Sequence, residues 1–95
     1  MDYDLNSIKE LVYKVYKVEN PSDEVVKRFI EMLDTLTERE LGVLSLKYGL
    51  VVPGNMLDIT VAEFFHISES RVRRYDVVAF KKLKHPVRMR YVFGE

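Results

Sequence analysis

The stretch FHISESRVRRY, residues 65–75, decides how the fold is interpreted. Ser68 is a typical helix N-cap residue, and apolar residues follow it at helical spacing, namely Val72, Tyr75, Ala79 and Leu83. His66 stands in the short break before Ser68, where a side chain that tolerates a positive φ is expected. The stretch therefore predicts a tight turn followed by a long helix that carries arginines at its start.

A shorter helix is predicted just before that turn. Asp58 is a plausible N-cap, and Val61, Ala62 and Phe65 follow with a spacing that directs them inward. The preceding segment, residues 50–57, contains a Pro-Gly-Asn turn sequence and is expected to be a loop. A short helix, a tight turn and a second helix with a polar first turn form the outline of a helix-turn-helix. We expect Pro86 to end its second helix.

The segment LTEREL, residues 36–41, gives the clearest signal for the start of a helix. Thr37 and Glu40 have the spacing of a capping box, and Leu36 and Leu41 that of a hydrophobic staple. Gly49 stands where a left-handed residue closes a helix. These signals predict a helix from about residue 38 to residue 48.

The first third of the chain is predicted with alternatives. Apolar residues recur at helical spacing from Leu5 to Tyr16, with Ser7 and Glu10 as a possible capping box. Residues 11–18, rich in β-branched and aromatic side chains, could equally form a strand. Asn20 and Pro21 predict the start of a further helix that ends near residue 35. Taken together, the chain is expected to be all-α, a small helical domain with a C-terminal helix-turn-helix.

Composition limits the possible functions. The 95 residues, 47% of them hydrophobic, suit one globular domain, and the absence of cysteine excludes disulfides, thiol nucleophiles and cysteine-based zinc sites. There is no apolar run long enough to span a bilayer and no basic start typical of a signal peptide, so we expect a soluble, cytoplasmic protein without a membrane partner.

Charge is distributed unevenly along the chain. The formal net charge is zero, but the residues from Arg71 onward carry +6 and the first 70 residues carry −6. Such an arrangement favours a C-terminal surface that binds a polyanion or an acidic protein, although helical proteins also segregate charge without a function.

Several separated motifs resemble region 4 of the sigma-70 family, the bacterial RNA polymerase specificity subunits. The family pattern is approximately LTxRExxVLxxRYGL, then a helix-turn-helix, then ALRKLRHP; the chain has LTERELGVLSLKYGL at residues 36–50 and AFKKLKHP at residues 79–86. The resemblance covers about residues 21–90. We accordingly expect an N-terminal helical extension at residues 1–19, a region 4-like domain at residues 20–90 and a C-terminal tail at residues 91–95.

The resemblance implies a DNA-binding domain of transcription initiation. Its final long helix would enter the major groove of double-stranded promoter DNA at the −35-type element, and the domain would also hold the β flap of RNA polymerase, with other sigma regions or a regulator as further partners. No cofactor is implied. Nothing in the chain resembles the sigma segment that melts the promoter, so we do not expect it to open DNA alone.

The residue types of the predicted recognition helix divide into two groups. The candidates for base edges are Glu69, Ser70, Arg73 and Arg74. The candidates for phosphates are Ser68, Arg71, Lys81, Lys82 and Lys84. Arginine pairs bidentately with guanine, so Arg73 or Arg74 could carry sequence information. Primary sigma factors typically have arginine, glutamate and glutamine at the three base-facing positions that hold Glu69, Ser70 and Arg74 here, which favours a different target sequence or backbone-dominated binding.

Two alternatives remain open from the sequence. The domain could be a protein-interaction module or regulator that binds RNA polymerase or another regulator without reading DNA, or the basic residues could form a merely solvated face. We expect no enzyme activity, because no acid/base pair or activated nucleophile can be assembled. We also expect no metal site, because His66 and His85 are too few and too far apart.

Overall fold

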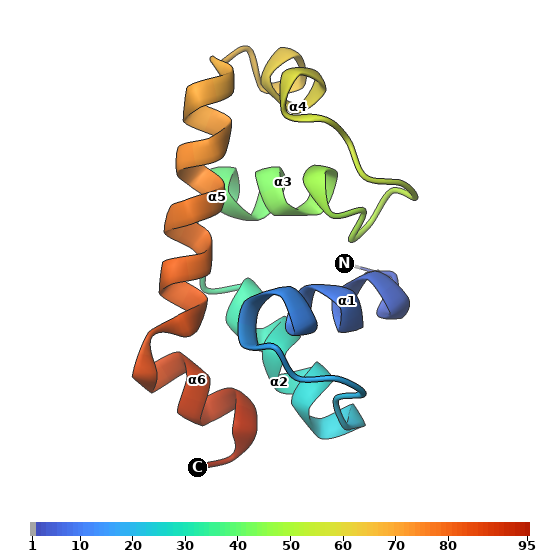
Figure 1. Cartoon of the computed structure of the whole chain (residues 1–95), viewed down its shortest axis with the longest axis vertical. Coiled ribbons are helices and arrows are strands. Elements are labelled where there is room, and N and C mark those ends of the chain that lie inside the picture. The colour runs from blue at the N-terminus through green and yellow to red at the C-terminus, as the bar shows by residue number, and fades with distance from the viewer. Residues whose placement is uncertain (1) are drawn as a thin grey trace.

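The structure, a computed structural model, describes residues 2–95, which form six α-helices and no strand (Figure 1). The helices are α1 (Leu5–Tyr16), α2 (Asp23–Leu33), α3 (Glu38–Lys47), α4 (Asp58–Phe65), α5 (Glu69–Lys84) and α6 (Pro86–Phe93). Helix α5 runs along one side of the molecule, with α4 and α3 beside its first half and α1 and α6 beside its second half, whereas α2 packs on α1 and α6 (Figure 1). The all-α fold with a helix-turn-helix is confirmed, and residues 11–16 are helical rather than extended.

The predicted start and end of α3 are confirmed. The Thr37 hydroxyl accepts from the Glu40 amide at 3.2 Å, and the Glu40 carboxylate accepts from the Thr37 amide at 3.0 Å, which is a complete capping box. Gly49 has a φ of +64°. A Cβ at this position would lie 2.8 Å from the backbone oxygen of Gly54, so both the backbone conformation and the close approach require glycine.

Three predicted caps are wrong. The N-cap of α1 is Asp4, whose carboxylate accepts from the amide and hydroxyl of Ser7, so Ser7 donates instead of capping. The N-cap of α2 is Ser22; Asn20 has a positive φ, whereas an N-cap residue needs extended backbone. Asp58 does not cap α4, because its carboxylate forms an ion pair with Lys47 at 3.1 Å.

Helix α6 was not predicted. Pro86 ends α5 as expected, but it is also the first residue of α6, where its missing N–H costs no intrahelical bond. His85 caps this helix, since its Nδ1 accepts from the amide of Val87 at 3.3 Å. The expected tail at residues 91–95 is wrong in part, because residues 91–93 complete α6 and Val92 is fully buried. The division of the chain near residue 20 stays a prediction.

Two clusters of buried apolar side chains hold the helices together. The larger cluster contains side chains from α1, α2, α3, α5 and α6, namely Ile8, Leu11, Val12, Val15, Val26, Phe29, Leu33, Leu36, Leu44, Leu50, Ala79, Leu83 and Val92. The smaller one lies under the helix-turn-helix and consists of Val43, Val61, Ala62 and Val72. Helix α5 contributes to both, so it connects the two cores. Helix α1 is an integral part of the fold, because four of its side chains are buried in the larger cluster.

A polar network fixes the helix-turn-helix on α3. The ammonium of Lys47 lies 2.8 Å from the carboxylate of Asp76 in α5 and 3.1 Å from that of Asp58 in α4. The Tyr48 hydroxyl also donates to Asp76 at 3.0 Å. Burial disfavours the charge of Lys47, but its hydrogen bonds to the two carboxylates outweigh this effect and raise the pKa of Lys47 above its usual value. Burial and the adjacent Asp76 carboxylate likewise raise the pKa of Tyr48.

Candidate nucleic-acid interface

The turn between α4 and α5 has the geometry that the sequence predicts. His66 adopts φ +56° and ψ +46°, the left-handed conformation that ends α4, and the amide of Ile67 donates to the carbonyl of Ala62 at 3.0 Å. The Ser68 hydroxyl then caps α5 by accepting from the amide of Arg71 at 3.2 Å. These bonds fix the direction of α5 relative to α4.

The first half of α5 presents one face to the core and the opposite face to solvent. Val72 is fully buried and Tyr75 half-buried, whereas four side chains at i, i+3, i+4 and i+7 are exposed, namely Ser70, Arg73, Arg74 and Val77. This set of four is called the outer stripe. The second helix of a helix-turn-helix uses such a face to contact base edges in the major groove.

Glu69 and Arg73 lie beside each other on one flank of α5. Their charged groups are 3.5 Å apart, and both side chains are largely exposed, at 44% and 56%. An exposed i, i+4 pair of this kind contributes at most about 0.5 kcal/mol. The pair can therefore open without a large cost, and both residues remain available to a ligand.

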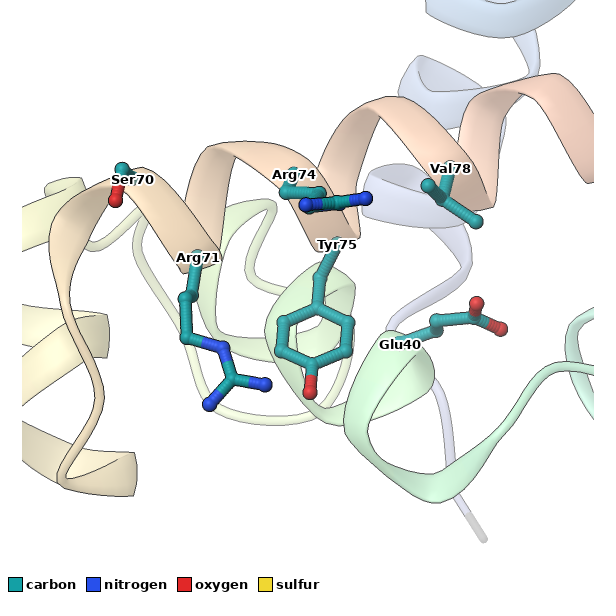
Figure 2. A pocket seen from close by; sticks show the side chains of 6 residues that line it. All are labelled: Glu40, Ser70, Arg71, Arg74, Tyr75 and Val78. Atoms are coloured by element: carbon teal, nitrogen blue, oxygen red, sulfur yellow. The ribbon is translucent and has the colours of Figure 1, made fainter.

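Ser70, Arg71 and Arg74 lie on the other flank, around a hollow between α5 and the start of α3. This hollow has a volume of about 340 Å³ and is also lined by Glu40, Tyr75 and Val78. Arg71 and Tyr75 extend from α5 toward α3, as Figure 2 shows. Within residues 2–95, the guanidinium groups of Arg71 and Arg74 form no ion pair or hydrogen bond. Two cations without a protein partner within residues 2–95 thus line this hollow.

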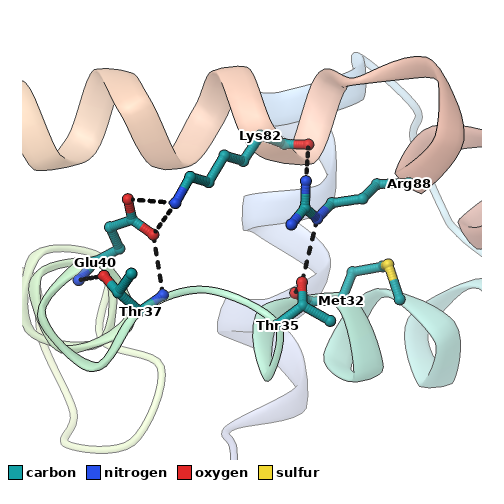
Figure 3. Close-up of polar contacts among 6 residues, drawn as sticks. All are labelled: Met32, Thr35, Thr37, Glu40, Lys82 and Arg88. Carbon is teal, nitrogen blue, oxygen red and sulfur yellow. Dashed lines mark hydrogen bonds and ion pairs between the residues drawn. The ribbon is translucent and has the colours of Figure 1, made fainter.

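Lys82 differs from the other candidates for phosphates. Its ammonium lies 2.9 Å from both carboxylate oxygens of Glu40 (Figure 3), and Glu40 is only 5% exposed. Burial of Glu40 disfavours its ionised form, but the hydrogen bonds from Lys82 and Thr37 outweigh this effect and lower the pKa of the carboxyl below its usual value. Lys82 therefore joins α5 to the capping box of α3, whereas Lys81, Lys84 and Ser68 are exposed.

An apolar hollow lies between α3, α4 and the loop that connects these two helices. It has a volume of about 440 Å³ and is lined mainly by apolar side chains, including Leu41, Leu46, Val51, Phe64 and Phe65. Phe64 is 64% exposed at its edge. In the middle of α3, a Cβ at Gly42 would lie 2.8 Å from the ring of Phe65, so glycine is what allows this ring to pack. This hollow was not predicted from the sequence, although the adjacent pair Phe64 and Phe65 was a signal for it.

Two other kinds of feature are absent from the region between residues 2 and 95. No group of three or more histidine, cysteine, aspartate or glutamate side chains in this region could hold a metal ion. Nor does any of the helices formed there have the length and apolar character needed to cross a membrane.

Comparison with known proteins identifies the domain. The family model for sigma-70, region 4, matches residues 32–85, from the end of α2 to the end of α5. The chain belongs to the sigma-70 region 4 family. Region 4 is a non-catalytic helix-turn-helix domain of transcription initiation. The matched residues include the turn, the outer stripe and the hollow between α5 and the start of α3.

Three sigma factors are similar to the region 4 part of the chain. The RNA polymerase sigma factors SigA of Microcystis aeruginosa and SigA of Synechocystis sp. are each 38% identical over 76 residues, and SigA1 of Synechococcus elongatus is 37% identical over the same length. Each alignment covers 74% of this chain but only 18% or 19% of the relative. The chain thus spans less than a fifth of the length of these curated relatives. No solved structure matches the chain.

Proposed function

We propose that this region 4 domain binds promoter DNA of the −35 type by placing α5 in the major groove. The observation that carries the proposal is the exposed surface of α5. Ser70, Arg73 and Arg74 are exposed along its outer stripe, and the guanidinium groups of Arg74 and of Arg71 on the adjacent flank have no partner within residues 2–95. Arginine side chains on an accessible helix face supply both phosphate neutralisation and bidentate guanine recognition.

Roles follow from the positions of the side chains. Arg74 and Ser70 face away from the core and are proposed to contact base edges, together with Arg73 and Glu69 once their surface ion pair opens. A glutamate at the start of the helix can accept from the amino group of cytosine, which is one way in which Glu69 would alter the preferred sequence.

Phosphate contacts are proposed along the flanks of the same helix. Arg71 lies at the edge of the hollow in Figure 2, and the Ser68 hydroxyl is exposed at the first turn, where helical amides favour an anion. Lys81 and Lys84 are exposed near the end of α5. A phosphate role of Lys82 would require its ion pair with the buried Glu40 to be broken, so Lys82 is the least favoured of this group.

We further propose that the domain docks on RNA polymerase through the β flap, as a sigma factor would. The alternative function, a module that binds RNA polymerase or a regulator without reading DNA, is favoured by one observation. The hollow between α3 and α4, with the exposed Phe64, offers an apolar surface of the kind that protein partners cover. This surface lies on α3 and α4, whereas the outer stripe lies on α5, so the two functions can be tested separately.

The decisive experiment measures duplex binding by fluorescence anisotropy at two salt concentrations, with promoter and scrambled sequences. Replacement of Arg71 and Arg74 together by alanine is expected to reduce affinity at least tenfold and to lower the salt dependence, because phosphate contacts are lost. Arg90→Ala is the matched control, since Arg90 is an exposed arginine on α6 and not on α5.

The outcomes separate the two functions. Salt-dependent binding with a sequence preference that the double variant loses supports the promoter reader. Absent or sequence-independent binding, combined with capture of a purified β flap fragment that Phe64→Gln weakens, would overturn it in favour of the protein-interaction module.

A further inference from the structure

Val77 is an exposed apolar side chain in the middle of the helix face proposed to contact DNA. It is 53% exposed and belongs to neither of the two apolar clusters. It also lines none of the hollows described above. Because valine is β-branched, it is a weaker helix former than the polar residues that usually fill exposed helix positions. Neither packing in the fold nor helix formation accounts for this residue.

We infer that Val77 reads a thymine methyl group in the major groove, next to the base contacted by Arg74. The inference rests on the proposed DNA binding and adds a specificity determinant to it. Thymine is the base that presents a methyl group in the major groove, and apolar side chains recognise it by direct contact.

The position of Val77 on α5 supports this assignment. Ser70, Arg73, Arg74 and Val77 have the spacing i, i+3, i+4 and i+7, which is also the spacing of the base-reading positions of the homeodomain recognition helix. Val77 completes the outer stripe on the side opposite to the buried Val72 and Ala79. Val77 lies three positions after Arg74, about 4.5 Å along a helix, which is comparable to the rise of about 3.4 Å between stacked base pairs.

The chemistry of the neighbours supports a base contact instead of a phosphate contact. Arg73 and Arg74 precede Val77, and Lys81 follows it by one turn, so the valine is an apolar position among cations. A valine side chain cannot bind a phosphate, but it can contact a base edge in the groove while the neighbouring cations bind phosphates. The order of Arg74 and Val77 on the helix predicts a target with a guanine that pairs with Arg74. A thymine is expected within one or two base pairs of this guanine, on either strand.

The test replaces thymine by deoxyuridine, which removes only the methyl group. A preferred sequence is first selected from a pool of random duplexes with the full chain, and each thymine is then changed in turn. For the parent chain, one position is expected to lose about fourfold in affinity, the equivalent of one methyl group removed from a contact. In Val77→Ala, the same substitution is expected to cost nothing, because the partner of the methyl group is absent.

Val87→Ala is the matched control, because Val87 is also an exposed valine but lies on α6, with 66% of the residue exposed. This variant is expected to keep the deoxyuridine penalty. If a preferred sequence is found but no deoxyuridine matters, or if the penalty persists in Val77→Ala, the inference is overturned while the proposed DNA binding stands. If no sequence is enriched and no duplex is bound, the proposed function and this inference fail together.

Discussion

Removal of the Glu40 carboxylate should destabilise the domain because two separate interactions are lost. Glu40 accepts from the Thr37 amide and pairs with Lys82, and it is 5% exposed. Loss of a cap costs about 1 kcal/mol, and loss of a charged hydrogen bond about 1.5 kcal/mol, at the low end because 35% of the Lys82 side chain is exposed to screening solvent. We therefore expect Glu40→Ala to lower the free energy of unfolding by about 2–3 kcal/mol.

The assay is thermal unfolding followed by circular dichroism. A loss of 1 kcal/mol lowers the Tm of a domain of this size by about 4–8 °C, so Glu40→Ala should lower Tm by roughly 8–24 °C. Glu40→Gln keeps an oxygen that accepts from the Thr37 amide and loses the charge, so its effect should be about half as large. Glu38→Gln is the control, because Glu38 is an exposed glutamate in the first turn of the same helix.

The pH dependence of stability tests the electrostatic contribution of Glu40 to the free energy of unfolding. The pKa of Glu40 is lower in the folded protein than the ordinary value of 4.5, so its ionised form stabilises the fold above the ordinary pKa. This contribution is lost as pH falls through the folded pKa. The difference in stability between the parent chain and Glu40→Gln should accordingly shrink in acid. If Glu40→Gln matched the parent at pH 7, or if a double-mutant cycle with Lys82→Met gave no coupling, the Glu40–Lys82 ion pair would not stabilise the fold as stated.

Four further changes test other parts of the structure. His66→Gly should leave stability unchanged or raise it by up to about 1 kcal/mol, since glycine accepts the positive φ at no steric cost; a clear fall in Tm would contradict this. Asp76→Asn should lower the free energy of unfolding by about 1–3 kcal/mol, because Lys47 loses its nearest carboxylate; an unchanged urea midpoint would contradict it. Tyr16→Phe removes the 2.7 Å bond from its hydroxyl to the Leu83 carbonyl and should cost about 1 kcal/mol by urea unfolding, an effect that an unchanged midpoint would exclude. Arg74→Ala alone should relax sequence preference, with discrimination against one base reduced by about 1–3 kcal/mol in anisotropy titrations; equal weakening on all duplexes would exclude a base contact.

Part of the features determined by residues close together in the chain could be predicted from the sequence, although the local caps Asp4 and Ser22 were missed. The capping box of Thr37 and Glu40, the cap at Ser68 and the left-handed His66 each depend on bonds within a few residues, and all are confirmed. The all-α fold followed from such local signals together with the apolar spacing.

Features determined by distant partners could not be predicted. Asp58 has the residue type of a cap, but Lys47, eleven positions earlier, takes its carboxylate. Lys82 has the residue type of a phosphate ligand, but its partner Glu40 lies 42 positions away. Tyr75 fits the core stripe, and only the packing of α5 on α3 places it beside Arg71 in the hollow.

Helix α5 contributes side chains to both cores, so a rotation of the helix at one core moves the residues at its other end. Its second half is embedded in the larger cluster through Ala79 and Leu83, whereas Ser70 lies 13 positions before Leu83, about 20 Å away along the helix. A tilt of about 6° at the embedded end would shift the first turn by about 2 Å. In the proposed complex, a shift of this size would break hydrogen bonds from the first turn to base edges. Substitutions in α1 or α6 that tilt α5 are therefore expected to change the sequence preference of the domain, although they lie outside the helix proposed to contact DNA.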